Sequence, residues 1–95
     1  MVSDSEQTVV DYFTGLLDAA KWQWRLVIYR GRKGCPDILC AGPYNRMFLV
    51  EMKRPKGGRL DPLQVEDHAE WFKVGVLVQV VWTREHADAF MVRHK

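Results

Sequence analysis

Apolar residues near the start of the chain recur at steps of three and four, which places them on one face of an amphipathic helix. The residues in this pattern are Val9, Val10, Phe13, Leu16, Leu17 and Ala20. Ser3 and Glu6 stand just before it with the spacing of a capping box. The sequence therefore predicts a first helix that ends near Ala20.

Short apolar segments alternate with turns over the next thirty residues or so. The segment 22–29 is rich in aromatic and branched residues and predicts a strand, followed by a basic turn at 30–34. A second strand is expected over 36–40, with a proline at its edge, and a turn over 42–45. A third strand is expected over 47–53. Because the connections are short, these three strands should form an antiparallel meander.

A second helix is predicted between residues that are typical of helix starts and helix ends. Asp61 is a good N-cap, Pro62 fits the first helical position, and Gly75 fits the position after the helix. The segment 76–82 that follows is almost continuously apolar. Such a run is typical of a strand buried on both faces, so the sequence predicts a fourth strand there.

The last element is a helix that Thr83 caps and that runs to about Val92. The predicted order is therefore α-β-β-β-α-β-α. A helix between the third and fourth strands permits a parallel crossover. The sequence thus predicts an α/β fold with a mixed four-stranded sheet flanked by helices.

Composition and length favour one globular domain spanning residues 1–95. The chain has 47% hydrophobic and 27% charged residues, which excludes a disordered tail. No apolar run is long enough to cross a bilayer, and the first residues are unlike a secretory signal. Cys35 and Cys40 are too few for a disulfide framework and lack the spacing of a zinc site. We therefore expect a cytoplasmic protein with no membrane contact and no small-molecule cofactor.

The net charge of +2 conceals a strongly basic middle. Residues 21–59 contain ten Lys or Arg and two acidic residues, which gives this segment a net charge of +8. The rest of the chain is acidic. Such asymmetry is typical of a protein with one face that binds phosphates. The candidate DNA-binding residues are Arg30, Arg32, Lys33, Arg54, Lys56 and Arg59.

Asp37, Glu51 and Lys53 are the candidate chemical groups. Asp37 follows a proline, and Glu51 stands fourteen residues later, two positions before Lys53. Because side chains alternate along a strand, Glu51 and Lys53 share a face with their α-carbons about 7 Å apart. Asp37, on the neighbouring strand of the hairpin, can lie beside Glu51.

Two adjacent carboxylates repel each other and lose solvation, and a divalent cation relieves both costs. Magnesium prefers oxygen ligands. Water activated by such a cation can attack phosphorus. Lys53 can orient or deprotonate that water, or stabilise the charge that develops on the phosphate.

This pattern resembles the PD-(D/E)XK nuclease superfamily and, more closely, its VRR-NUC family, the virus-type replication-repair nuclease domain. The residues that carry the resemblance are Glu6, the string Gly34-Cys35-Pro36-Asp37, the segment 48–53 with Glu51-Met52-Lys53, Gln64, and Gly75 before an apolar strand. The resemblance covers about residues 5–90 and implies the PD-(D/E)XK nuclease core.

The resemblance also implies roles for individual residues. Asp37 and Glu51 become metal ligands, with the backbone carbonyl of Met52 as a third and Glu6 reaching the metal directly or through water. Lys53 becomes the catalytic lysine. Gln64 matches a glutamine of the family and completes the catalytic set of Asp37, Glu51, Lys53 and Gln64. The expected cofactor is Mg²⁺, with Mn²⁺ as a substitute.

The chain is most similar to stand-alone phage members of the family, which would place it in a host cytoplasm. This likeness implies a homodimeric, structure-selective DNA endonuclease that acts at branched DNA such as four-way (Holliday) junctions. The alternative is a nucleic-acid-binding module that keeps the fold without turnover. A sequence-specific restriction-type nuclease ranks below both, because no insertion is large enough to read bases.

Several of these residues have simpler roles open to them. Asp37 can bond turn amides, and Glu51 with Lys53 can form an exposed pair. Glu6 and Gln64 both have capping-box spacing, which does not exclude a functional role. His68 is expected at the surface or an interface, away from the motif.

The aromatic residues of the first strand are a separate candidate. Trp22 and Trp24 can stack on bases, but packing under the first helix or at a subunit contact is favoured. With Tyr29 they are the expected dimer interface.

Overall fold

The computed structural model describes residues 4–31 and 33–94, and its secondary structure follows the order α-β-β-β-α-β-α. The predicted α/β fold is confirmed. The elements are α1 (Glu6–Ala19), β1 (Gln23–Leu26), β2 (Ile38–Gly42), β3 (Arg46–Met52), α2 (Pro62–Lys73), β4 (Gln79–Val81) and α3 (Arg84–His94).

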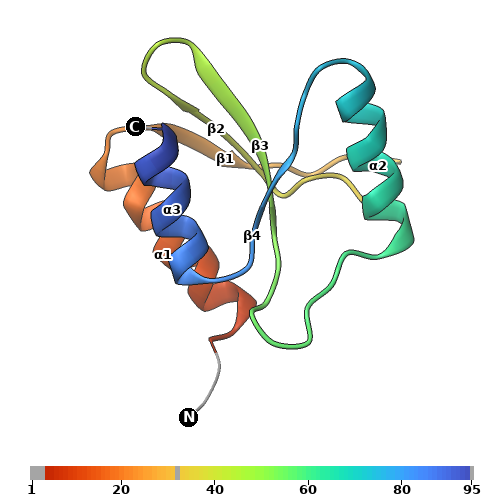
Figure 1. The fold of residues 1–95 in the computed structure, drawn as a ribbon, viewed down its shortest axis with the longest axis horizontal. Helices are drawn as coiled ribbons and strands as arrows, with labels where there is room; N and C mark the ends of the chain where they lie inside the picture. Colours follow the sequence, from red (N-terminus) through yellow and green to blue (C-terminus); the bar gives the residue numbers. More distant parts are fainter. Residues whose placement is uncertain (1–3, 32, 95) are drawn as a thin grey trace.

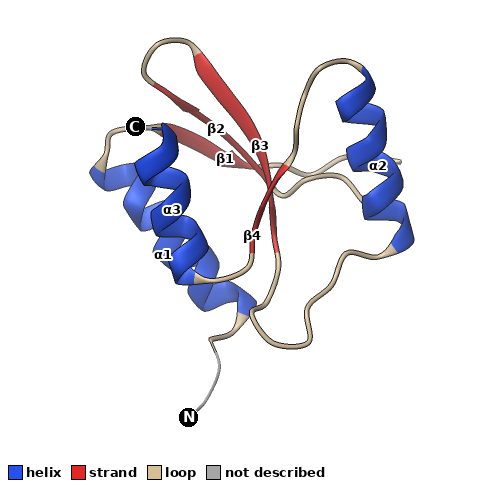
Figure 2. Cartoon of the chain, viewed as in Figure 1, coloured by secondary structure: helices blue, strands red, loops and turns tan. Residues whose placement is uncertain are grey.

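The four strands form one mixed sheet in the order β1-β2-β3-β4. The β1–β2 and β2–β3 pairs are antiparallel, as the short turns require, and β3 and β4 are parallel because α2 carries the chain across between them. The helices α1 and α3 lie together on one face of this sheet, and α2 lies on the other (Figure 1). Figure 2 shows the sheet edge-on between the two layers.

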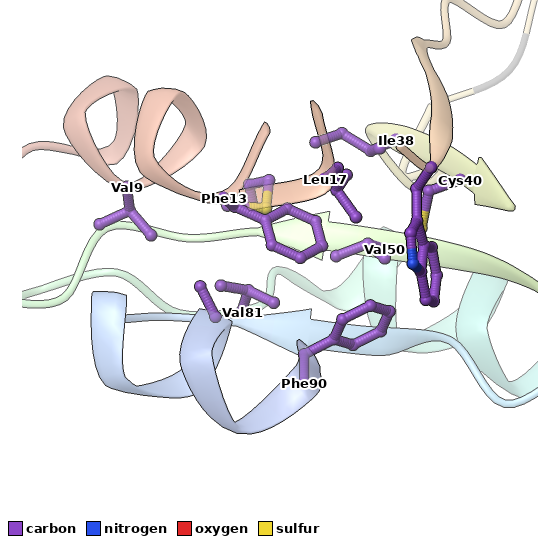
Figure 3. Close-up of a cluster of buried hydrophobic side chains, with 11 residues drawn as sticks. Val9, Phe13, Leu17, Ile38, Cys40, Val50, Val81 and Phe90 are labelled. Atoms are coloured by element: carbon purple, nitrogen blue, oxygen red, sulfur yellow. The ribbon is translucent and has the colours of Figure 1, made fainter. Parts of the chain in front are cut away.

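The hydrophobic core lies between the sheet and the α1–α3 layer. Figure 3 shows the side chains that meet there, among them Val9, Phe13 and Leu17 of α1, Ile38, Cys40, Val50 and Val81 of the sheet, and Phe90 of α3. The rings of Phe13 and Phe90 pack edge to face with centroids 5.2 Å apart. The α2 helix takes no part in this core.

Trp22 belongs to this core, which confirms the predicted packing under the first helix; its place in the expected dimer interface is wrong, because the side chain is buried within the monomer. Its side chain is buried, and its ring stacks on Phe48 with centroids 6.0 Å apart. The indole lies directly over the backbone of Gly42, where an added Cβ would overlap it. A side chain on Gly42 would therefore displace the indole, so the observed packing of Trp22 requires glycine at this position.

Two predicted strands are shorter than the sequence indicated. The first was expected over 22–29, yet it covers only Gln23–Leu26. Val27 still bonds to the Asp37 carbonyl, and pairing ends there because Pro36 has no amide to donate.

The other short strand is the fourth, which covers Gln79–Val81 where 76–82 was expected. The amide of Val76 bonds to the Trp71 carbonyl and closes the end of α2. The start of this apolar segment therefore completes a helix end and does not enter the sheet.

The helix starts are set by short polar side chains. At α1 the N-cap is Ser5, whose Oγ accepts a hydrogen bond from the Thr8 amide at 3.0 Å. The expected capping box of Ser3 with Glu6 is therefore replaced, and Ser3 lies outside the described residues. At α2 the predicted capping by Asp61 is confirmed. Thr83 caps α3 by accepting from an amide at 3.0 Å.

Among the described residues, no helix is both long enough and apolar enough to span a membrane.

Gly42→Ala should destabilise the protein by about 1–3 kcal/mol, the usual cost of overpacking, because the new methyl group displaces the Trp22 ring. The measurement is the urea midpoint followed by tryptophan fluorescence. Gly15→Ala is the matched control. Gly15 lies inside α1 with open space around it, so this change should stabilise by roughly 0.5–1 kcal/mol. Equal stability of the two variants would contradict the packing argument.

Candidate active site

Glu51 occupies an unusual position for an acidic residue, since only 1% of it is exposed. It lies near the end of β3, between Val50 and Met52. Because side chains alternate, these two neighbours point into the core under α1 and α3, and Glu51 points to the opposite face, toward α2. One strand thus serves the core with one face and the candidate site with the other.

Asp37 lies beside Glu51, as the sequence predicted. It immediately precedes β2, and its amide donates to the Val50 carbonyl at 3.0 Å. Its Oδ2 accepts a hydrogen bond from the Met52 amide at 2.8 Å. Two backbone contacts to β3 therefore fix the Asp37 carboxylate at the end of the strand that carries Glu51.

The surroundings raise the pKa of Glu51 to about 9. Burial is the largest cause, followed by a side-chain hydrogen bond with Asp37 and by the charge of Asp37. The positive charge of Lys53 opposes the shift, and the negative charge of Glu6 adds to it to a smaller extent. In the metal-free protein at neutral pH, Glu51 therefore holds a proton.

Gln64 connects α2 to Glu51 and also caps the helix. Its Nε2 donates to Glu51 Oε2 at 3.2 Å. Its side-chain Oε1 accepts a hydrogen bond from the backbone amide of Asp61 at 3.0 Å. The backbone amide of Gln64 in turn donates to Asp61 Oδ1 at 3.0 Å. The capping role that the sequence predicted is therefore present, and the capping bond also orients the side-chain amide that faces Glu51.

His68 lies in this site, and the expectation that it stands apart from the motif is wrong. Its Nε2 is 3.4 Å from Glu51 Oε1. Burial lowers the pKa of His68 below its ordinary value. The sequence contained a signal for this position, since residues four apart share a helix face and His68 stands four residues after Gln64.

Gly34 explains how α2 comes so close to the acidic pair. Its φ of +81° suits glycine, and an added Cβ would lie 2.6 Å from the carbonyl of Leu63 at the start of α2. The loop that carries Asp37 therefore packs backbone to backbone against the first turn of α2.

Lys53 follows β3 and opens onto a cleft with a volume of about 550 Å³. Glu6, from the first turn of α1, and Arg54 and Arg59 line the same cleft. The Lys53 amide donates to the Val81 carbonyl at 3.0 Å, which ties this residue to the end of β4. The cleft thus places Lys53, the expected catalytic lysine, together with Glu6, the expected further metal ligand, and with two arginines.

The other basic candidates fall into two groups. Lys56 is exposed on the loop that also carries Arg54 and Arg59. Lys33 lines a separate hollow against α2, together with Leu63 and Glu66, and Arg30 is exposed nearby in sequence. Arg32 lies outside the described residues.

The carboxyl groups of the site are the candidate ligands for a divalent cation. Within 4–31 and 33–94, no cluster of three or more His, Cys, Asp or Glu side chains is close enough to hold a metal ion. Asp37 and Glu51 form a pair, and their shared site carries a proton that a cation would replace. Two carboxylates with all-oxygen donors fit Mg²⁺, which keeps several waters and needs few protein ligands.

No family model matches the chain. A solved structure described as a VRR_NUC domain superposes with a TM-score of 0.86 and 29% sequence identity, over 95% of this chain and 97% of that one. A curated protein of Acyrthosiphon pisum secondary endosymbiont phage 1, named "Putative nuclease p44", is 41% identical over 51 residues. That match spans 54% of this chain and 54% of the phage protein, so about half of the relative's length is covered. The whole-chain structural likeness, together with this relative, supports the resemblance to the VRR-NUC family that the sequence indicates.

Proposed function

We propose that the chain is a metal-dependent nuclease that hydrolyses phosphodiester bonds in DNA. The observation that carries the proposal is the buried Glu51 carboxyl beside Asp37, which feels the charge of Lys53, a residue that lines a cleft with Arg54 and Arg59. Two adjacent buried acids are costly without a positive charge between them, and a cation bound there would relieve the repulsion and attract an anionic substrate. We further propose that residues 1–95 act as one nuclease domain.

Asp37 and Glu51 would hold the metal through their carboxylates. The carbonyl of Met52 and the side chain of Glu6, directly or through water, are the proposed further ligands. Bound Mg²⁺, or Mn²⁺ in its place, would supply Lewis-acid polarisation of the phosphate and an acidified water.

The protein groups then divide the remaining work. Lys53, on the face of the sheet that carries Glu51, orients or deprotonates the attacking water, or stabilises negative charge on the phosphate. Gln64 holds the carboxyl of Glu51 in place through its hydrogen bond. Arg54 and Arg59 in the cleft, and Lys56 on their loop, neutralise flanking phosphates. We propose that the DNA beyond this cleft contacts a second set of basic residues, Arg30, Arg32 and Lys33.

We also propose that the substrate is branched DNA and that the active form is a homodimer. Two active sites related by a twofold axis can act on two strands of a four-way junction. Leu26 and Ile28 support a contact between copies, because they lie on and beside the edge strand β1 and are 63% and 91% exposed. Tyr29 continues this surface into a hollow of about 340 Å³ lined by Trp71 and Val74.

Trp24 is a weaker interface candidate than Tyr29. It is half-buried, and its Nε1 donates to Asp18 Oδ1 of α1 at 2.8 Å. The revised interface therefore runs from the β1 edge toward α2.

The alternative is a nucleic-acid-binding module without turnover. The lack of a ready three-residue metal cluster in the described part of the chain favours it. The two functions differ in what they require of Lys53, because a pure binder has no use for a lysine at the acidic pair.

Labelled duplex, flap, fork and four-way-junction DNAs, incubated with Mg²⁺ or with EDTA, test the function. We expect cleavage only with metal, while binding persists in EDTA. Lys53→Ala should lower the cleavage rate by about 10²–10⁴-fold with little change in melting temperature. Lys73→Ala, at an exposed position of α2, is the matched control and should cut normally. Cleavage that survives EDTA would contradict the metal, and binding without cleavage on every substrate would favour the alternative.

The free energy of unfolding of the metal-free protein should fall as pH rises from about 5 to 9. Glu51 has a pKa of about 9 when folded, against an ordinary value of 4.5 when unfolded. Between these values the folded chain holds one more proton than the unfolded chain, so a rise in pH favours unfolding. Urea unfolding at several pH values measures this slope. Glu51→Gln should flatten it and the exposed Glu66→Gln should not; equal slopes in all three proteins would refute a protonated Glu51.

Light scattering after size exclusion should give a mass of twice the 11.1 kDa chain. Ile28→Lys should halve that mass, because it places a charge in the proposed contact. Val92→Lys, at an exposed position of α3, should leave the mass unchanged. A monomeric wild-type protein at micromolar concentration would exclude the dimer, and a dimer that Ile28→Lys leaves intact would place the contact elsewhere.

A further inference from the structure

His68 and Gln64, both on α2, contact the carboxyl group of Glu51. Gln64 Nε2 lies 3.2 Å from Oε2, and His68 Nε2 lies 3.4 Å from Oε1. The two residues are one helical turn apart, so both side chains project from the same face of α2. Each oxygen of Glu51 therefore has its own nitrogen neighbour from one rigid helix.

This arrangement compensates for a difference between the two carboxylates. Asp37 is oriented by a backbone amide, that of Met52, at 2.8 Å. The contacts described for the Glu51 carboxyl come from side chains, namely Asp37, Gln64 and His68. Its orientation thus depends on α2, and the Gln64 contact by itself fixes only one of its oxygens.

We propose that His68 is a positioning residue, which holds Glu51 Oε1 by donating from Nε2 and so fixes the rotamer in which Glu51 can bind a divalent cation. The proposal rests on the proposed metal role of Glu51 and adds a residue to it. The His68 imidazole needs its proton on Nε2 to fill this role. It touches neither substrate nor metal, and acts only through Glu51.

The placement of α2 makes this contact consequential. Asp67 is the one buried residue of α2, whereas Leu63, Val65 and Phe72 are each about half exposed or more. Apolar packing therefore does little to fix this helix on the sheet. Polar contacts at Glu51 contribute correspondingly more to the geometry of the site, and loss of one donor should loosen the carboxyl.

Calorimetric titration of metal-free protein with MnCl₂, in the absence of DNA, tests the proposal without measuring activity. His68→Leu removes the donor at similar volume and should weaken Mn²⁺ affinity by about 10–100-fold, as is usual for loss of a group that orients a metal ligand. His68→Gln, whose Nε2 can reach the same oxygen, should bind within about threefold of the wild type. His86→Leu on α3 is the matched control and should bind normally.

The outcomes separate the proposal from the function on which it rests. Wild-type protein that binds no Mn²⁺ would overturn both the metal site and the role of His68. If the wild type binds, then unchanged affinity in His68→Leu would overturn only the positioning role. Affinity in His68→Gln as weak as in His68→Leu would show that packing matters rather than the donor. Should His68→Leu fail to fold, His68→Phe gives the same comparison and keeps a ring.

Discussion

The burial of Glu51 beside Asp37 is the constraint on which the site depends. Removing a carboxylate from water costs several kcal/mol, and a second carboxylate nearby adds repulsion. In the metal-free protein a proton offsets this cost, which is why the pKa of Glu51 rises to about 9. The fold thus maintains a position where a positive charge is needed, and any cation that binds there must compete with that proton.

The alternation of β3 lets a small chain carry both a core and such a site. Val50 and Met52 fill the core beneath α1 and α3, while Glu51 between them faces α2. A shift of one residue in the β2–β3 register would exchange the two faces and bury apolar side chains where the acid now lies. The observed pairing of Ile38 with Val50 therefore secures the hydrophobic core and the acidic pair at once.

The sequence predicted what depends on local pattern and missed what depends on approach between distant segments. Strand alternation and turn spacing were enough to bring Asp37 beside Glu51. They were not enough to show that Gly42 leaves room for the Trp22 ring, since nothing local relates those two residues. The prediction for His68 was wrong for a similar reason. His68 is far from the motif along the chain, but it lies one helical turn from Gln64 and therefore beside Glu51.

The lengths of β1 and β4 could not be read from apolar composition, because hydrogen bonding ended each strand. Pro36 lacks an amide, and the amide of Val76 is used to close α2. Both segments stay apolar beyond the sheet, and in part they stay exposed. Leu77 and Ile28 are the examples, at 64% and 91% exposure.

The light packing of α2 links the stability of this helix to the chemistry beneath it. The helix holds its place partly through Gln64 and His68, and their partner is the group that carries the proton or the cation. A change of charge at Glu51 must therefore alter the contacts that hold α2. A helix buried by many apolar side chains would be insensitive to such a change. Phe72 and Val74, at the end of α2, are 67% and 73% exposed, so they would be available to the proposed contact between copies near Tyr29.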